Sequence, residues 1–437
     1  KDTGRYDDIM NQGHDAAALF ERIGPAPAFP AGGPMAEDPG WLFDRGLACQ
    51  LAFGRAEGLG LQDAALARSP LFRVRSPCAG PAALRVLALC APGDLMVNTP
   101  LDFLTGALDV RLDLLFLQPG RALPPVIPDH DLAFFAANET EPAALARLRR
   151  LFRLWPRPAL NDPTFLPRLD RAALSAALAG IPGICSPSAV AVSRAELDIY
   201  LLTGRPLRGL GTEAADGYPL LIRPFGSHAG TGLARADDPA ALRDYLRHSI
   251  ESRFHVTRFE EYAGPDGLYR KRRIAFIDRE PFLCHMAISS HWMVHYLNAG
   301  MTTSAEKRAM EDRAMAGFEG GFARRHEAAF AALHRHLGFD LYAIDCAETR
   351  DGRLLVFEAD TAAIIHAMDP PDLFPYKVPQ MQKVFAAFGA LLRRRAAGAD
   401  RGSEPAGELA DGQSGANGRE PSGVSQSKTF SVIEISV

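Results

Sequence analysis

The stretch that decides the fold is PLLIRPFGSHAGTGL, residues 219–233. Its apolar first half predicts a strand, which ends in the cation Arg223. The loop after the strand is built from small and polar residues: Gly226, Ser227, His228, Gly230, Thr231 and Gly232. Because glycine has no Cβ, backbone N–H groups in such a loop can approach phosphate oxygens. By itself the stretch fits a phosphate-binding loop or an ordinary hairpin loop, with His228 near a ligand or capping the loop.

A second informative stretch is YRKRRIAFI, residues 269–277, in which four cations precede an apolar run. Strand alternation sends Arg270 and Arg272 to one face and Lys271 and Arg273 to the other. One pair can then face a cleft while the other stays in solvent, and the pattern leaves open which pair does so. A charge run that is solvated throughout is the alternative.

Three carboxylates stand in a third stretch, DCAETRDGRLLVFEAD, residues 345–360. Two strands joined by a turn at Asp351 and Gly352 would place Asp345 beside Glu358, and Asp360 would share the face of Glu358. Carboxylates that close repel one another unless a hard cation such as Mg²⁺ neutralises them. The alternative is a solvated acidic face, which the flanking apolar residues disfavour because they bury these strands.

The rest of the chain predicts an α/β and α+β protein. Its 437 residues, 47% of them hydrophobic, are enough for several domains with a substantial core. We expect a helical N-terminal segment at 1–79, with helices at 9–23 and 41–68, and an α/β domain at 80–190. Short apolar runs in that domain, at 85–91, 112–117, 131–137 and 157–162, predict strands of a parallel sheet, followed by a helix at 166–178.

Residues 191–397 predict an α+β domain. Its expected strands are 218–225, 254–262, 269–277, 281–288, 341–348 and 354–360, and its expected helices are 238–251, 304–317, 320–337 and 377–397. Residues 398–426 lack aromatic side chains and predict a flexible linker. The last segment, SKTFSVIEISV at 427–437, alternates as a β-prone peptide.

Composition and charge narrow the class of protein. Lys and Arg number 48 against 52 Asp and Glu, so no basic excess attracts nucleic acid. No apolar run reaches the ~18 residues of a membrane span. Six cysteines without metal-type spacing fit reduced thiols, and we expect a cytoplasmic protein.

Taken in order, these features resemble the ATP-grasp superfamily, in its glutathione synthetase and RimK-like branch of carboxylate–amine ligases. The resemblance covers about residues 85–395 and includes LNDP at 160–163. The stretches at 219–233, 267–278 and 291–301 are similar to a group that often carries N-terminal tetratricopeptide repeats. Membership of that group would account for the helical N-terminal segment at 1–79.

The resemblance implies ATP and Mg²⁺ as ligands and an acyl phosphate on the way to an amide or ester. Arg171 and Arg223 stand where the family commonly has two ATP-contacting lysines, a departure because guanidinium is bulkier than an ammonium point charge. Residues 226–232 match the phosphate loop, and Asn298 is expected near the phosphates. The linker that binds adenine and ribose matches Glu260, Glu261 and Tyr262.

The metal and catalytic residues follow from the same resemblance. Asp345, Glu358 and Asp360 match the magnesium ligands, the last in place of a customary asparagine. One pair from the basic strand, Arg270 with Arg272 or Lys271 with Arg273, would hold the transferring phosphoryl group. His285, His291 and His295 lack the spacing of a zinc site and are expected to form a substrate-facing wall.

The C-terminal peptide is itself a candidate substrate. The flexible linker at 398–426 has an r.m.s. end-to-end distance of roughly 30 Å, so the peptide after it could reach an active site. The peptide offers one side-chain carboxylate and several nucleophiles: Lys428, Thr429, Ser431, Glu434 and Ser436. The alternative is a linker whose last strand pairs with a sheet edge.

Three hypotheses about function therefore stand. The first is a ligase for a peptide or small-molecule carboxylate, with the chain's own or a neighbour's tail as one candidate. The second is a nucleotide-binding module without turnover, and the third is an interaction protein that uses its helical opening and terminal strand. A homo-oligomer, with no nucleic acid or membrane partner, is expected for the first.

Overall fold

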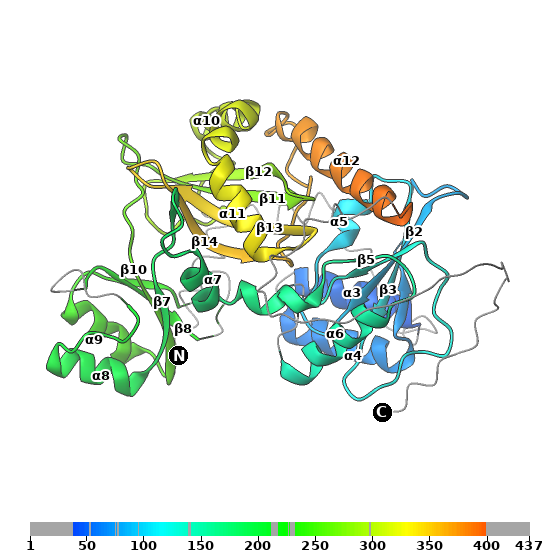
Figure 1. Cartoon of the computed structure of the whole chain (residues 1–437), viewed down its shortest axis with the longest axis horizontal. Helices are drawn as coiled ribbons and strands as arrows, with labels where there is room; N and C mark the ends of the chain where they lie inside the picture. The colour runs from blue at the N-terminus through cyan, green and yellow to red at the C-terminus, as the bar shows by residue number, and fades with distance from the viewer. Residues whose placement is uncertain are drawn as a thin grey trace, which may run out of the picture. The chain divides into compact units, whose positions relative to one another are not determined.

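The protein is described by a computed structural model that covers residues 38–51, 54–74, 76, 78–94, 96–138, 141–210, 217–225, 227, 232–296 and 299–398. The chain divides into two units, Lys1–Ala399 and Asp400–Val437, and every described residue lies in the first. Three sheets with their helices make up the described part (Figure 1). The predicted helix at 9–23, the linker and the terminal peptide lie outside it, apart from Gly398.

The described part opens with two helices, α3 (Pro39–Leu51) and α4 (Arg55–Arg68), where the sequence predicts helix over 41–68. They pack closely because glycines face each other. A Cβ built on Gly58 would lie 2.6 Å from the carbonyl oxygen of Gly46, which no side chain could tolerate. Two facing glycines thus set the approach of the helices.

The first sheet has the order β1-β3-β2-β4-β5. Its strands are β1 (Leu71–Arg73), β2 (Leu84–Cys90), β3 (Val110–Phe116), β4 (Leu132–Phe135) and β5 (Ala159–Leu160). All pairings are parallel except that of β1 with β3, so the four predicted apolar runs are confirmed as strands of one parallel sheet. The helices of this region are α5 (Leu101–Thr105) and α6 (Pro142–Leu154).

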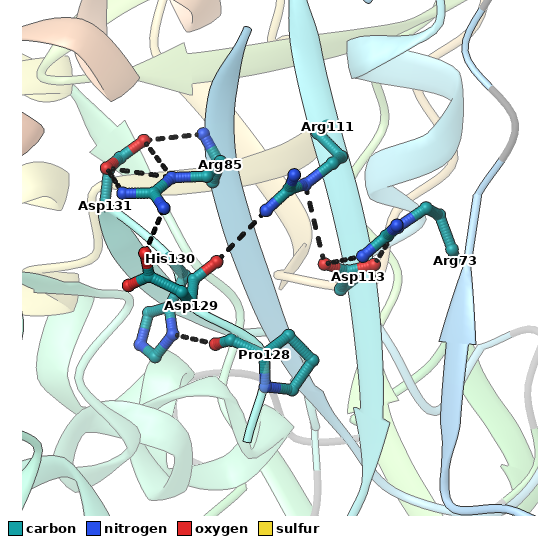
Figure 2. Close-up of polar contacts among 8 residues, drawn as sticks. All are labelled: Arg73, Arg85, Arg111, Asp113, Pro128, Asp129, His130 and Asp131. Atoms are coloured by element: carbon teal, nitrogen blue, oxygen red, sulfur yellow. Dashed lines mark hydrogen bonds and ion pairs between the residues drawn. The ribbon is translucent and has the colours of Figure 1, made fainter. Parts of the chain in front are cut away.

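An ion-pair network crosses this sheet (Figure 2). Arg85 on β2 binds Asp131 through its guanidinium and through its backbone N–H, the latter 2.8 Å from Asp131 Oδ2. On β3, Asp113 forms an ion pair with Arg73 of β1, with Arg73 Nε 2.7 Å from Asp113 Oδ1. Arg111 Nε lies 3.9 Å from the other oxygen, Asp113 Oδ2. Arg73 and Asp113 are direct cross-strand partners, so the pair supports the short edge strand in its register.

The second sheet is antiparallel, in the order β7-β10-β8-β9. Its strands are β7 (Ala189–Ser193), β8 (Leu220–Pro224), β9 (Ala234–Ala236) and β10 (Arg253–Arg258), and its helices are α8 (Arg194–Thr203) and α9 (Pro239–His248). The glycine-rich stretch therefore joins two hairpin strands. β10 ends at Arg258, short of the predicted 262, because its partner β8 begins at Leu220, opposite Arg258.

The third sheet has the order β12-β11-β13-β14-β6. Its strands are β6 (Ile184–Cys185), β11 (Tyr269–Ile277), β12 (Glu280–Ser289), β13 (Leu341–Glu348) and β14 (Leu354–Asp360). The last four agree with the sequence prediction. β6 lies within the predicted 80–190 domain but pairs parallel with β14 in the third sheet. β7, which begins at the end of that predicted domain, pairs with β10 in the second sheet.

Helices cover this third sheet. One face packs on α10 (Ala305–Ala316), a π-helical turn (Glu319–Ala323) and α11 (Glu327–Leu337). The α-helix predicted at 320–337 starts at Glu327 and is preceded by the π-helical turn. Glycines at 317, 320 and 321 disfavour a regular α-helix before that residue. A 3-10 helix (Pro163–Leu169) precedes α7 (Arg171–Leu178) where one helix was predicted at 166–178.

The long helix α12 (Lys377–Ala396) ties the first and third sheets together. Phe388, which is fully buried, packs its ring 6.1 Å from that of Phe134 on β4. The same hydrophobic cluster contains Ile277 of β11 and Leu391 of α12. The two sheets therefore share one core.

Candidate active site

Asp345 is the centre of the charged face of the third sheet. It pairs in register with Arg273 on β11 and Glu358 on β14. Arg273 binds it bidentately, with Nε 2.9 Å from Oδ1 and Nη2 3.1 Å from Oδ2, and Lys271 Nζ lies 2.8 Å from Oδ2. Asp345 is only 3% exposed. Burial opposes its charge, but Arg273 and Lys271 outweigh this and hold its pKa below the usual range.

Glu358 lies next to Asp345, as the turn at Asp351 and Gly352 predicts. A bulge leaves Phe357 without a partner on β13, so that Glu358 rather than Phe357 stands opposite Asp345. Arg171, in the first turn of α7, reaches Glu358 with Nη2 2.6 Å from Oε2. Burial would raise the pKa of Glu358, but the charge of Arg171 lowers it. The predicted ATP-contacting Arg171 and the predicted magnesium ligand Glu358 are thus bound to each other.

Asp360 shares the face of Glu358. Its Oδ1 accepts hydrogen bonds from Asn138 Nδ2 at 3.0 Å and from the backbone N–H of Ala362 at 2.7 Å. Within the described residues, Oδ2 has no hydrogen-bond partner. Burial, reinforced by the charge of Glu358, raises the pKa of Asp360 to about 6. Asn138 was not predicted, because it lies 222 residues away in the chain and carries no motif.

Arg223 ends β8, and its Nε donates to Ser227 Oγ at 2.9 Å. Burial lowers its pKa to about 10, and the nearby positive charge of Arg171 adds to the shift. At Gly232, φ is +66° and a Cβ would lie 2.7 Å from Pro224 Cδ. Both the left-handed backbone and the lack of space for a side chain require glycine at this position.

The basic strand divides as alternation predicts, and the structure decides which pair meets the carboxylates. Lys271 and Arg273 do so, whereas Arg270 and Arg272 lie on the opposite face. Arg270 Nη1 is 3.0 Å from Asp266 Oδ1, and Arg272 stacks over the ring of Phe322 at 4.3 Å. Arg270 and Arg272 are therefore away from Asp345.

The predicted linker residues 260–262 follow β10 and border an aromatic cluster. Tyr262 packs edge to face with Tyr269 and Phe357, at ring distances of 4.8 and 5.3 Å. Glu261 Oε1 accepts from the backbone N–H of Ala263 at 2.8 Å. No hydrogen bond or ion pair joins Glu260 to another described residue. The cluster offers apolar faces beside the charged groups on the same side of the sheet.

The predicted histidine wall is split. His285 and His295 lie near Lys271 and Arg273, and burial together with these positive charges lowers the pKa of both imidazoles. His291 instead accepts from the backbone N–H of Met293 at 3.2 Å through Nδ1. Behind His285, whose ring lies 4.6 Å from that of Tyr296, is a buried Lys377–Glu311 pair that no sequence signal indicated.

The carboxylates of this charged face are the candidate ligands for Mg²⁺. Within the described residues no group of three or more His, Cys, Asp or Glu side chains is arranged around one point for a metal ion. Asp345 has both oxygens bound to cations. Glu358 and Asp360 fit a hard cation better, because they are adjacent oxygen donors and Asp360 retains an oxygen without a described partner.

Several predicted residues lie outside the described part of the chain. These are Gly226, His228, Gly230, Thr231 and Asn298, and the tail residues Lys428, Thr429, Ser431, Glu434 and Ser436. In the part that is described, no helix is long and apolar enough to cross a membrane.

Comparison with known proteins gives no match to a family model and none to a curated protein. Solved structures do match. A RimK domain ATP-grasp protein from Sphaerobacter thermophilus is 19% identical, with a TM-score of 0.40 over 70% of this chain and 99% of that one. The D-alanine–D-alanine ligase from Coxiella burnetii is 11% identical, with a TM-score of 0.42 over 72% and 97%. VanG D-Ala:D-Ser ligase from Enterococcus faecalis is 12% identical, with a TM-score of 0.40 over 70% and 99%.

Proposed function

We propose that the chain is an ATP-grasp ligase that activates a carboxylate as an acyl phosphate and joins it to an amine or hydroxyl group. The observation that carries the proposal is the convergence of charge on one face of the third sheet. Lys271 and Arg273 of β11 bind Asp345, and Arg171 of α7 binds Glu358. Arg223 of β8 is near enough for the charges of Arg171 and Glu358 to act on its pKa. Four cations against Asp345, Glu358 and Asp360 favour a polyanion with a divalent cation.

Each charged group has a role in this proposal. Asp345 holds Lys271 and Arg273 in place, and these two cations bind the transferring phosphoryl group. Glu358 and Asp360 would hold Mg²⁺, which supplies positive charge to the phosphate oxygens when bound. Asp345 acts as a positioning residue rather than a metal ligand, because its oxygens already bind cations.

Arg171 and Arg223 would contact the remaining phosphates. A guanidinium group can bind phosphate oxygens bidentately, as two parallel N–H···O bonds. Arg171 must then share or release Glu358, to which it is bound at 2.6 Å. The aromatic faces of Tyr262 and Phe357 suit a nucleotide base at the edge of the same charged face.

The proposed reaction has two steps, phosphorylation of the carboxylate and transfer of the acyl group. A carboxylate oxygen attacks the γ-phosphorus, the bond to the β–γ bridging oxygen breaks, and ADP leaves. An amine or hydroxyl group then attacks the acyl carbon, phosphate leaves, and the nucleophile loses a proton. Charge compensation, rather than an acid–base triad, is what the first step needs.

One observation favours a second candidate, a nucleotide binder without turnover. The Arg171–Glu358 ion pair occupies Glu358 Oε2, an oxygen that Mg²⁺ would need. By the resemblance, Arg171 and Arg223 also stand where the family commonly has lysines. In such a binder, ATP would be held but not cleaved.

The test measures Mg²⁺-dependent ATP binding and then ADP release in the presence of a panel of amino acids and dipeptides. We expect binding by the wild type, a loss of at least tenfold in Glu358→Gln and Lys271→Met, and no change in Arg270→Gln, the matched basic residue on the other face. ADP release with an acceptor supports the ligase. Binding without ADP release for any acceptor supports the second candidate, and absence of Mg²⁺-dependent binding refutes both.

The substrate beyond ATP is proposed only by class. It is a peptide or small-molecule carboxylate, and the tail residues 427–437 remain one candidate. A cytoplasmic location and a homo-oligomer stay predictions from the sequence and the resemblance.

A further inference from the structure

A pocket lies on the opposite face of the third sheet, where β11 and β12 meet the turn between α10 and α11. It has a volume of about 180 Å³. Its walls include three arginines and three apolar side chains: Arg272, Arg313, Arg325, Leu283, Phe318 and Phe322. None of these residues takes part in the charged face around Asp345.

Arg272 lies against an aromatic ring rather than against a carboxylate of the described residues. Its guanidinium lies over the ring of Phe322 at 4.3 Å, and within the described residues no carboxylate lies at ion-pair distance from it. Burial lowers its pKa, and the positive charges of Arg270 and Arg325 add to the shift, while the charge of Glu348 acts in the opposite sense. Arg272 is half-buried, and a half-buried guanidinium with no carboxylate beside it favours the approach of an anion.

The other two arginines increase the positive charge of the pocket. Arg325 binds Glu348, with Nε 3.2 Å from Oε1 and Nη2 3.0 Å from Oε2, and its guanidinium lies 5.7 Å from the Phe322 ring. Arg313, in the last turn of α10, has no ion-pair partner among the described residues. Three guanidinium groups therefore line the pocket, and Glu348 is the carboxylate bound to one of them.

The rest of the pocket is apolar and irregular. Leu283, Ala314, Phe318 and Phe322 line it, and Phe322 belongs to the π-helical turn. Such turns are rare and occur frequently at functional sites. At Gly321, a Cβ would meet nothing closer than Arg325 Nη1 at 4.0 Å, so the wall is open there.

We propose that this pocket binds a small organic acid, with its carboxylate between Arg272 and Arg313 and its apolar body against Phe318, Phe322 and Leu283. A carboxylate matches the planar guanidinium fork, which binds it bidentately. The apolar lining selects an acid with a hydrocarbon body over a bare inorganic anion. The site is separate from the proposed ATP site, since Arg272 and Lys271 point to opposite faces of β11.

The probe for this site is phenylacetate, titrated calorimetrically into the full chain, with phenylacetamide, acetate and inorganic phosphate in parallel. We expect saturable binding of phenylacetate and at least tenfold weaker binding of the other three. Arg313→Gln should weaken phenylacetate at least tenfold and Arg272→Met should abolish its binding. Arg335→Gln, an exposed arginine on α11 outside the pocket, is the matched control and should change nothing.

Two further variants separate this proposal from the proposed function. Lys271→Met and Glu358→Gln should bind phenylacetate as the wild type does, even though they impair ATP binding. Arg313 is exposed, so its substitution tests the site even if Arg272→Met fails to fold. The proposal is overturned if the wild type shows no saturable binding, if the amide or phosphate binds as well as phenylacetate, or if Arg313→Gln binds like Arg335→Gln.

Discussion

At the scale of single residues, the protein is organised by carboxylates that each hold a cation. Asp345 holds Lys271 and Arg273, Glu358 holds Arg171, and on the other face Glu348 holds Arg325. Removing one member of a buried pair leaves the other charge uncompensated, which costs far more than the pair contributes. The consequences should therefore be visible in stability as well as in ligand binding.

Glu348 gives a prediction about pH. Burial would raise its pKa, but His326 and Arg325 lower it to about 2, against 4.5 for an unperturbed glutamate. Because the folded pKa is below the unfolded one, Glu348 stabilises the fold above about pH 4.5, and this contribution is lost as the pH falls towards 2. Glu348→Gln should therefore lower the free energy of unfolding by about 1–3 kcal/mol at pH 7, and less at pH 4.

Urea unfolding of the two proteins at pH 7, 5.5 and 4 measures this difference. The control is Glu319→Gln, since the ion pair that Glu319 forms among the described residues is an exposed one, with Lys383 Nζ 3.1 Å from Oε1. That substitution should change stability by less than about 0.5 kcal/mol. A difference for Glu348→Gln that stays constant from pH 7 to pH 4 would contradict the explanation.

At the scale of elements, α12 is fixed at its first residue by a buried ion pair with α10. Lys377 and Glu311 are 3% and 0% exposed, and Lys377 Nζ lies 3.5 Å from Glu311 Oε1. Glu311 also accepts from the backbone N–H of Met286 at 2.8 Å and from the hydroxyl of Tyr376 at 2.7 Å. These contacts join α10, α12 and β12.

We predict that Lys377→Met lowers the free energy of unfolding by about 3–5 kcal/mol, because it removes the cation from the buried Glu311 and from Asp369, whose Oδ2 lies 3.2 Å from Lys377 Nζ. Adding Glu311→Gln should recover part of the loss, since glutamine can still accept from the Met286 N–H without carrying a charge. Guanidinium unfolding of the wild type, both single variants and the double variant gives the coupling energy. Additive losses would mean that the two groups do not stabilise each other.

The apolar face of α12 leads to another prediction. Phe388 is fully buried against Phe134 in the core that the first and third sheets share. Phe388→Ala should cost about 3–5 kcal/mol. Val378→Ala, at a 38% exposed position of the same helix, should cost less than about 1 kcal/mol. Equal losses for the two variants in thermal unfolding would show that α12 does not join these sheets.

At the scale of the whole molecule, the described site residues and their partners all lie between Asn138 and Lys377, within the unit Lys1–Ala399. A chain ending at Ala399 should thus bind Mg²⁺–ATP as tightly as the full chain. Equilibrium binding of ATP to both chains measures this. A more than threefold loss of affinity on truncation would mean that residues 400–437 contribute to the site.

The same pair of chains tests the tail as a substrate. Intact-mass measurement after incubation with ATP and Mg²⁺ would detect the loss of one water for each bond formed. Loss in the full chain that maps to residues 427–437, and none in Glu358→Gln, would identify the tail as substrate. An unchanged mass would leave the ligase with an external substrate only.

The strands and the carboxylate register could be read from the sequence because they depend on local rules. Apolar runs of strand length and the turn at Asp351 and Gly352 place Asp345 beside Glu358 within sixteen residues of chain, and the structure has that pairing. β1, β6, β7 and β9 were not predicted. β1, β6 and β9 have only two or three residues, too few to show a periodicity by themselves, whereas β7 has five and was missed. The end of β10 was placed too late because a strand stops where its partner stops.

What the sequence by itself determined is therefore the set of charged groups and their alternation along β11 and β14. Which face of β11 carries the proposed chemistry was decided only by tertiary structure, since it depends on α10, α11 and α12 covering the sheet. The same holds for Asn138 at Asp360, the Lys377–Glu311 pair and the three arginines around Phe322. Each joins residues far apart in the chain, and such contacts are fixed by packing rather than by local spacing.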